Sequence, residues 1–316
     1  MNKRPLGRSG LQIAPLVLGG NVFGWTVDQA TAFSLLDRFI DAGLDTIDTA
    51  DVYSTWVPGN RGGESETIIG NWLKATPGRR EQTVIITKVG SPMAPDRKGL
   101  SAKWIVTAAE DSLRRLQTDR IDLYLTHRPD PDTPVEETLR AYEQLIAQGK
   151  VRAIGASNLD AAQLREALAV ASEKDLPRYE VQQPEYNLYD RAGYEAGLRD
   201  LCIAEGQGVI TYYSLASGFL SGKYRSSDDL GKSVRGQGIA RYLDARGLKI
   251  LQALDTVAAN HDATPAEVAL AWLIAREGVT APIASATTIE QLDSLVRATR
   301  LALPTPDIAL LDSASA

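Results

Sequence analysis

Short apolar strands alternate with amphipathic helices along most of the 316-residue chain, and this alternation restricts the fold more than any other feature. We count eight strand–helix units after a short hairpin expected at residues 3–14. Strands that alternate with helices pair in parallel through right-handed crossovers. The strands are apolar throughout, which is typical of a parallel sheet buried on both faces.

Eight such units in about 300 residues predict a (β/α)8 barrel with an N-terminal β-hairpin. The alternative is a doubly wound open sheet, but no Gly-x-Gly-x-x-Gly follows the first strand. No composition break divides the chain, so we predict one domain over residues 1–316. The expected strands are residues 15–20, 43–48, 83–88, 121–127, 151–157, 179–183, 208–214 and 279–285. The expected helices are residues 28–42, 64–75, 101–117, 133–149, 159–173, 192–205, 240–260, 264–277 and 288–300, with a short last helix near Pro306.

Composition excludes several classes of protein. With 44% apolar and 23% charged residues, the chain is typical of globular proteins, and its interspersed charges, net −6, indicate no nucleic-acid surface. No apolar run reaches the roughly 18 residues of a membrane span, and no signal sequence begins the chain. A single cysteine, Cys202, excludes an internal disulfide, and two histidines argue against a His-rich metal site. We expect a cytoplasmic protein with no metal and no nucleic-acid or membrane partner, and a homo-oligomer remains open.

Three successive strands end in polar residues that are rarely buried without a partner. These residues are Asp48, Lys88 and His127, and Tyr53 follows the first of them by five positions. Any one of them alone can be a satisfied polar residue at a strand terminus. The C-terminal ends of barrel strands meet at one mouth, so their repetition predicts an active site. Later strand ends add further groups that can hold a ligand: Ser157, Asn158, Gln183, Tyr213, Ser214 and Ser285.

The longest segment without a strand or helix pattern covers residues 215–238 and is rich in Gly, Ser and basic residues. Loops of this length inside a compact domain are usually functional, and we interpret this one as a flap over the mouth. Its backbone N–H groups can bind an anion, so Lys223 and Arg225 are candidate phosphate contacts. The alternative is that both are solvated surface charges.

The chain resembles the aldo-keto reductases, most closely their bacterial and potassium-channel-β-like branch. The resemblance covers nearly the whole chain and depends on DTADVY, the strand endings ITK and THRPDP, GASN, QPEYNLYDR and YYSLASGFLSGKY. It implies a (β/α)8 barrel with NADP(H) extended across its mouth and no metal. It also implies a small-molecule carbonyl or alcohol as substrate.

The resemblance implies roles for individual residues. Tyr53 matches the proton donor, and Asp48, Lys88 and His127 match its supporting residues. A nearby lysine ammonium is expected to lower the pKa of the Tyr53 phenol. Ser157, Asn158 and Gln183 match the groups that bind the nicotinamide carboxamide, and Tyr213 matches the aromatic that stacks on its ring, although a core aromatic is the alternative. The full expected cofactor set is Gly20, Asn21, Asp48, Ser157, Asn158, Gln183, Tyr213, Ser214, Leu215, Ala216, Gly218, Lys223, Arg225, Ser285, Thr287 and Gln291.

Two segments depart from the family pattern. The stacking aromatic is followed by Ser214-Leu215-Ala216 where a Ser-Pro-Leu is usual. After the last strand, the chain has Ser285-Ala286-Thr287-Thr288 and then Gln291, without the Lys or Arg that holds a 2′-phosphate in many relatives. Hydroxyl groups and a helix N-terminus can still bind phosphate. We therefore expect NADP(H), with NAD(H) as the alternative.

The substrate is less constrained. Trp25 and Trp56 are expected to supply apolar walls, although each can equally be a surface aromatic, and Arg128 can meet an acidic or polyol substrate. The leading hypothesis is an NADP(H)-dependent oxidoreductase that reduces aldehyde or ketone carbonyls with Tyr53 as general acid. The alternatives are an NAD(P)-dependent sugar or polyol dehydrogenase and a cofactor-binding regulatory subunit, because a fold alone does not decide among them.

Overall fold

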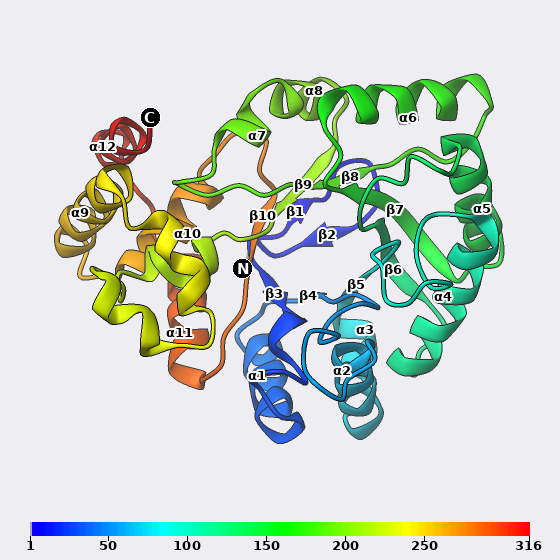
Figure 1. Ribbon diagram of the computed structural model, residues 1–316, viewed down its shortest axis with the longest axis horizontal. Helices are drawn as coiled ribbons and strands as arrows, with labels where there is room; N and C mark the ends of the chain where they lie inside the picture. Colours follow the sequence, from blue (N-terminus) through cyan, green and yellow to red (C-terminus); the bar gives the residue numbers. More distant parts are fainter. Residues whose placement is uncertain (1) are drawn as a thin grey trace.

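A computed structural model describes residues 2–316 and shows the predicted fold (Figure 1). Eight parallel strands form a closed barrel in the order β10-β3-β4-β5-β6-β7-β8-β9. In register, Asp48 at the end of β4 lies opposite Gly19 of β3 and Ile86 of β5. The barrel strands are β3 (Val17–Gly19), β4 (Thr46–Asp48), β5 (Val84–Val89), β6 (Ile121–Thr126), β7 (Val151–Ser157), β8 (Val181–Gln183), β9 (Gly208–Thr211) and β10 (Ala281–Ala284).

The hairpin of β1 (Arg4–Pro5) and β2 (Gln12–Ile13) closes the N-terminal end of the barrel. Leu6 is fully buried and belongs to the apolar cluster that fills the barrel interior. Gly7 has a φ of 58°, and a Cβ there would lie 2.3 Å from the backbone nitrogen of Gly208, so only glycine permits this approach. Because the hairpin seals one end, a ligand reaches the interior from the C-terminal ends of the strands.

Helices form the outer layer, and their apolar faces pack against the barrel in two further clusters, each larger than the interior one. Among the described residues, no helix is long and apolar enough to cross a membrane. The last helix packs beside α9 at the rim (Figure 1). The helices are α1 (Gln29–Asp41), α2 (Glu64–Ala75), α3 (Arg79–Gln82), α4 (Ala102–Leu116), α5 (Val135–Ala147), α6 (Ala161–Glu173), α7 (Ala192–Glu195), α8 (Leu198–Ala204), α9 (Ala245–Asn260), α10 (Pro265–Ile274), α11 (Ile289–Ala298) and α12 (Thr305–Ser315).

Several local expectations differ from the structure. The helix expected at 192–205 is two helices, because Gly197 adopts a φ of 95° between α7 and α8. The helix expected from residue 133 begins at Val135 with Pro134 as its N-cap, and the Thr133 hydroxyl donates to Asp130. The helix expected from residue 240 begins at Ala245, where the Asp244 side chain accepts a hydrogen bond from Gly247 N. The segment 215–238 is largely three short 3₁₀ helices, η2 (Ala216–Ser221), η3 (Ser227–Lys232) and η4 (Gly236–Tyr242), and another, η1 (Gly20–Val22), follows β3.

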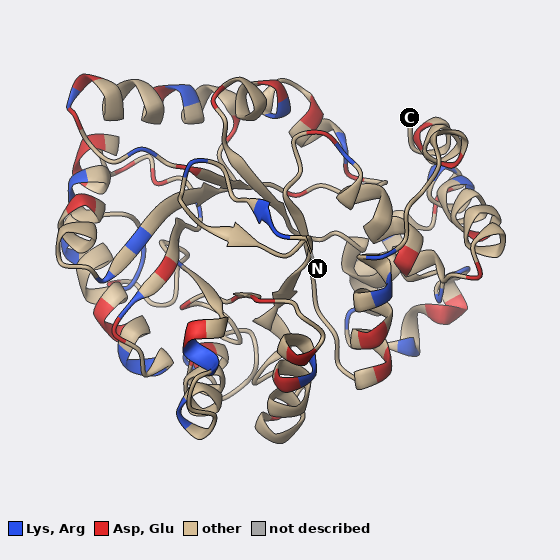
Figure 2. Cartoon of the chain, turned by 180° about the vertical axis from the view of Figure 1, so that it is seen from behind, with Lys and Arg blue, Asp and Glu red and all other residues tan. Residues whose placement is uncertain are grey.

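Acidic and basic residues are interspersed over the outer helices, and neither sign dominates this layer (Figure 2). Some pairs join neighbouring helices, such as Arg38 of α1 with Asp293 of α11 at 2.8 Å. Ion pairs this exposed contribute about 0–1 kcal/mol each. The apolar core therefore supplies most of the stability, and the charges that bear on function lie at the barrel mouth.

Candidate active site

A cavity of about 960 Å³ opens at the C-terminal end of the barrel. All eight barrel strands, or the loops that directly follow them, contribute to its lining. The expected catalytic groups Asp48, Tyr53 and His127 line the cavity, and Lys88 lies buried next to them. The strand ends thus bring together residues that are up to 79 positions apart in the sequence, since 127 − 48 = 79.

Lys88 is the centre of a compact hydrogen-bonded cluster. Its Nζ donates to Asp48 Oδ2 at 2.6 Å, to the backbone oxygen of Thr49 at 2.8 Å and to Tyr53 Oη at 2.9 Å. Gln183 donates to the second oxygen of Asp48 at 2.8 Å. Burial lowers the pKa of Lys88, and the adjacent Asp48 carboxylate opposes this change. All three polar hydrogens of the ammonium therefore have acceptors, as a buried charge requires.

The pKa of Tyr53 is a correction to the expectation from sequence. Burial raises it well above the usual value of a phenol, and Asp48 raises it further. The Tyr53 hydroxyl lies 3.2 Å from Asp48 Oδ2, close enough to donate to it. Burial and the adjacent Asp48 carboxylate thus outweigh the lowering of the Tyr53 pKa that was expected from Lys88. Tyr53 therefore stays protonated at neutral pH and holds a proton that it can donate.

His127 lies beside Tyr53, with 6.1 Å between the ring centroids. Its Nδ1 is buried and has no hydrogen-bond partner within residues 2–316. Burial lowers its pKa well below the usual value, and the charges of Lys88 and Arg128 lower it further. The imidazole is therefore neutral at neutral pH, so one ring nitrogen carries a proton and the other can accept one.

The residues expected to bind the nicotinamide carboxamide lie together, and in this structure they form hydrogen bonds with one another. Ser157 Oγ donates to the backbone oxygen of Gln183 at 2.8 Å. The Asn158 amide donates to His127 O at 2.8 Å and to Ser157 Oγ at 3.1 Å. Asn158 Oδ1 accepts from Tyr212 at 2.6 Å. These bonds fix the side chains in place, and Tyr212 is a member of the group that the sequence did not reveal.

Tyr213 lies two residues after β9 and lines the cavity, and the residue is 47% exposed. Its backbone has a φ of 51°, which is uncommon for a non-glycine residue. Asn187 donates to its backbone oxygen at 3.0 Å and so helps to hold this conformation. The exposed ring face is available to stack on a planar ligand.

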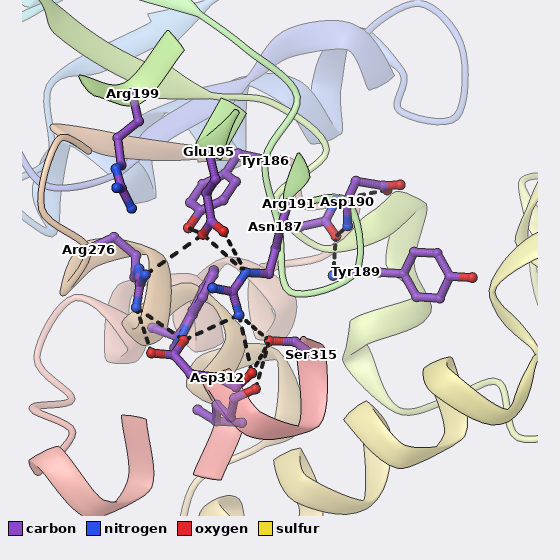
Figure 3. Close-up of polar contacts among 12 residues, drawn as sticks. Tyr186, Asn187, Tyr189, Asp190, Arg191, Glu195, Arg199, Arg276, Asp312 and Ser315 are labelled. Carbon is purple, nitrogen blue, oxygen red and sulfur yellow. Dashed lines mark hydrogen bonds and ion pairs between the residues drawn. The ribbon is translucent and has the colours of Figure 1, made fainter. Parts of the chain in front are cut away.

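The segment that carries Asn187 is anchored to the C-terminal helix (Figure 3). Arg191 donates to Glu195 at 3.1 Å and to Ser315 Oγ of α12 at 2.7 Å. Arg276, which follows α10, forms an ion pair with Asp312 of α12 at 2.9 Å. The network therefore ties α12 to the loop that supports Tyr213.

The residues expected to contact phosphate separate into two groups. Ser214, Leu215, Gly218 and Lys223 line the cavity, and Ala216 is fully buried beside them. Arg225 lies outside the lining and forms a two-bond ion pair with Asp255, at 2.7 Å for each bond. Arg225 is thus a surface ion-pair residue in this structure and lies outside the lining in which the phosphate contact was expected.

At the last strand, Ser285, Thr287 and Gln291 line the cavity as expected, together with Asn21. Ser285 donates to Asn21 Oδ1 at 2.6 Å, and Gln291 accepts from Thr287 N at 2.9 Å. Gly20 is buried directly after β3 but is not part of the lining. Among the described residues of β10 and α11, no lysine or arginine lines the cavity. Arg297 pairs with Glu267 instead.

The substrate candidates Trp56 and Arg128 line the cavity, whereas Trp25 does not. Trp25 packs edge-on against Trp56 with 5.6 Å between centroids, so it supports the wall from outside the lining. The sequence also missed five lining residues of the flap, Ser217, Ser221, Ser233, Val234 and Arg235. The length of segment 215–238 indicated a functional loop, but no motif marked which of its side chains turn inward.

Known proteins resemble this chain over almost its full length. The profile of the Aldo/keto reductase family matches residues 15–316. "Uncharacterized oxidoreductase YrpG" of Bacillus subtilis (strain 168) is 35% identical, over 97% of this chain and 94% of its own length. "Probable voltage-gated potassium channel subunit beta" of Oryza sativa subsp. japonica is also 35% identical, over 98% and 94%. "Protein tas" of Escherichia coli (strain K12) is 31% identical, over 99% and 97%.

Three independent observations agree. The closed parallel barrel with its N-terminal hairpin, the buried Lys88 cluster at its mouth and the end-to-end similarity all indicate one group of proteins. On this evidence, the chain belongs to the aldo/keto reductase family.

Proposed function

We propose that this protein is an NADP(H)-dependent oxidoreductase that reduces aldehyde and ketone carbonyls to alcohols, with Tyr53 as the general acid. The family uses nicotinamide cofactors, and the residues at the mouth fit one. The exposed ring of Tyr213 matches the nicotinamide, and Lys223, whose ammonium makes no ion pair with the described residues, lies near Gly218 where phosphates would pass. The cofactor, when bound, supplies the hydride. NAD(H) is the alternative, because Gln291 and Thr287 bring no charge for a 2′-phosphate.

The observation that carries the proposal is the 2.9 Å contact between Lys88 Nζ and Tyr53 Oη. Protonated Tyr53 donates its proton to the carbonyl oxygen as the carbonyl carbon gains a hydride. The phenolate that remains is stabilised by the adjacent ammonium, and Asp48 holds that ammonium in place. Neutral His127 donates a hydrogen bond that orients the carbonyl oxygen. In alcohol oxidation, the same phenolate takes the proton back.

The test is NADPH and NADH oxidation with benzaldehyde by the wild type and by Tyr53→Phe, which removes only the hydroxyl. We expect kcat to fall by about 10²–10⁴-fold in the variant, the usual contribution of a general acid. NADPH binding, measured by protein fluorescence, should be retained and serves as the control for folding. Equal turnover by both proteins would show that Tyr53 is not the acid.

A second candidate is a cofactor-binding regulatory subunit, favoured by the similarity to the rice channel subunit. Tight cofactor binding with negligible turnover of every carbonyl and polyol tested would support it over a reductase. A polyol dehydrogenase, by contrast, would show faster NADP+ or NAD+ reduction with sugar alcohols than carbonyl reduction with the reduced cofactor. Steady-state rates in both directions therefore separate the three hypotheses.

A further inference from the structure

Lys88 Nζ donates to the backbone oxygen of Thr49, a neutral acceptor that takes no part in proton transfer. An ammonium has three N–H donors, and their directions are fixed relative to one another. Two of them meet Asp48 Oδ2 at 2.6 Å and Thr49 O at 2.8 Å, so the third points toward Tyr53 Oη at 2.9 Å. Asp48 supplies the charge that holds the ammonium, and the Thr49 oxygen sets its direction.

Thr49 is itself held at two further atoms. It directly follows β4, and its N–H donates to Ile86 O of β5 at 2.8 Å. Its hydroxyl donates to Ser65 Oγ of α2 at 2.8 Å. Because its nitrogen is fixed to the barrel and its side chain to a helix, the Thr49 carbonyl has little freedom to turn away from Lys88.

Ser65 continues this chain of hydrogen bonds. Its hydroxyl donates to Gly20 O at 2.7 Å while it accepts from Thr49, so the direction of both hydroxyl groups is defined. A Cβ at Gly20 would lie 2.9 Å from Ser65 Oγ and 3.1 Å from Asp48 O, so the three segments pack closely here. Thr49 and Ser65 are fully buried, and neither lines the cavity. Any effect that they have on the reaction must therefore pass through other groups.

A buried hydroxyl beside Lys88 does not by itself reach the ammonium's acceptors. Thr87 precedes Lys88 in β5, but its hydroxyl donates to Glu66 Oε1 at 2.5 Å. Glu66 is not one of the three acceptors of Lys88. The bond between Thr49 and Ser65 differs, because it holds a residue whose carbonyl Lys88 contacts directly.

We propose that Thr49 and Ser65 are positioning residues for the proton transfer: their hydroxyl chain fixes the carbonyl that directs the Lys88 ammonium at Tyr53. The inference rests on the proposed function, because it concerns the same proton donor, and it extends the machinery to two residues outside the cavity lining. An ammonium that is directed less well stabilises the phenolate less, so loss of the hydroxyl chain should slow proton donation.

The experiment compares Thr49→Val, which is close to threonine in shape but lacks the hydroxyl, with Thr49→Ser, which retains it. The first readout is the single-turnover rate of NADPH oxidation with benzaldehyde, which excludes product release. We expect this rate to fall about tenfold in Thr49→Val and in Ser65→Ala, because a buried hydrogen bond is lost, and to be largely kept in Thr49→Ser. Thr138→Val is the matched control, since its hydroxyl is also buried and donates to a backbone oxygen, Leu100 O at 3.1 Å, but lies on α5 in the outer layer.

A second readout follows Lys88 itself and needs no turnover. The carbon NMR signal of Lys88 Cε, assigned by its absence from Lys88→Met, reports the pKa of the ammonium in a pH titration. Burial already lowers this pKa. A Thr49 oxygen that is held less well stabilises the charged form less, so the pKa should fall by a further amount of about 0.5 in Thr49→Val and Ser65→Ala. It should stay at the wild-type value in Thr49→Ser and Thr138→Val.

An unchanged rate or an unchanged Lys88 pKa in Thr49→Val would overturn the inference, and Ser65→Ala decides by the same criteria where Thr49→Val does not fold. Equal losses in Thr49→Ser or Thr138→Val would also overturn it, because the effect would then come from packing or from any buried hydroxyl. If the wild type reduces no aldehyde, the proposed function fails, and the titration of Lys88 decides alone. A lower pKa in Thr49→Val and Ser65→Ala then upholds the positioning role, and an unchanged pKa refutes it.

Discussion

Replacement of Lys88 by Met tests how the catalytic cluster is held together. Lys88 is fully buried, and Asp48 is only 1% exposed. Lys88→Met keeps most of the apolar stem but removes three hydrogen bonds and leaves the Asp48 carboxylate with two neutral donors, Gln183 and Tyr53. Breaking a buried ion pair by removal of one partner costs about 3–5 kcal/mol, because a buried charge is left uncompensated.

The double variant Asp48→Asn with Lys88→Met removes both charges. The amide oxygen of the introduced asparagine can still accept the hydrogen bond from Gln183, and its amide nitrogen can donate to Tyr53 Oη in place of the second carboxylate oxygen. We therefore expect the double variant to regain about 2 kcal/mol or more of the loss. Arg225→Met is the control for loss of an ion pair as such, because Arg225 and Asp255 are 43% and 48% exposed. That variant should lose about 1 kcal/mol or less.

Urea unfolding without cofactor, followed by tryptophan fluorescence and circular dichroism, measures these free energies where both probes give one midpoint. The reasoning would be refuted if Lys88→Met were no less stable than Arg225→Met. It would also be refuted if the double variant were as unstable as Lys88→Met, since the loss would then not come from the unpaired carboxylate.

Three further predictions concern the same mouth. The pKa of His127 is lowered in the folded state, so below about pH 6.5 the unfolded chain binds a proton that the folded chain does not. The free energy of unfolding should therefore fall as the pH drops below about 6.5. His127→Gln should flatten this part of the curve of stability against pH. Asn187→Leu removes the hydrogen bond to the backbone oxygen of Tyr213 and should weaken NADPH binding about tenfold in a fluorescence titration. Unchanged NADPH binding would show that the position of Tyr213 does not matter for the cofactor. Gln291→Arg places a cation at the last strand–helix junction, where it can pair with the 2′-phosphate that only NADPH carries. The ratio of NADPH affinity to NADH affinity should rise about tenfold in equilibrium titrations. An unchanged ratio would place the 2′-phosphate elsewhere.

The sequence predicted the barrel, its hairpin and the residues of the Lys88 cluster. The alternation of strands and helices can be predicted because it depends on the periodicity of apolar residues along the chain. Once the barrel closes, the C-terminal ends of its strands must meet at one mouth. The positions of Asp48, Lys88 and His127 at the mouth therefore follow from their places in the chain. The pKa of Tyr53 did not follow, because it depends on burial and on the Asp48 carboxylate beside it rather than on its proximity to Lys88 alone.

Tertiary structure alone decided which loop side chains face the cavity. Arg225 and Arg235 lie in the same flap and are equivalent in sequence terms, yet Arg225 reaches Asp255 of α9, and Arg235 turns toward Trp25. Tyr212 and Asn158 are 54 residues apart, and only the closed barrel brings them within hydrogen-bond distance. The physical reason is that strand and helix patterns are set by neighbours in the chain, whereas partners of loop residues are set by what the completed fold places opposite them.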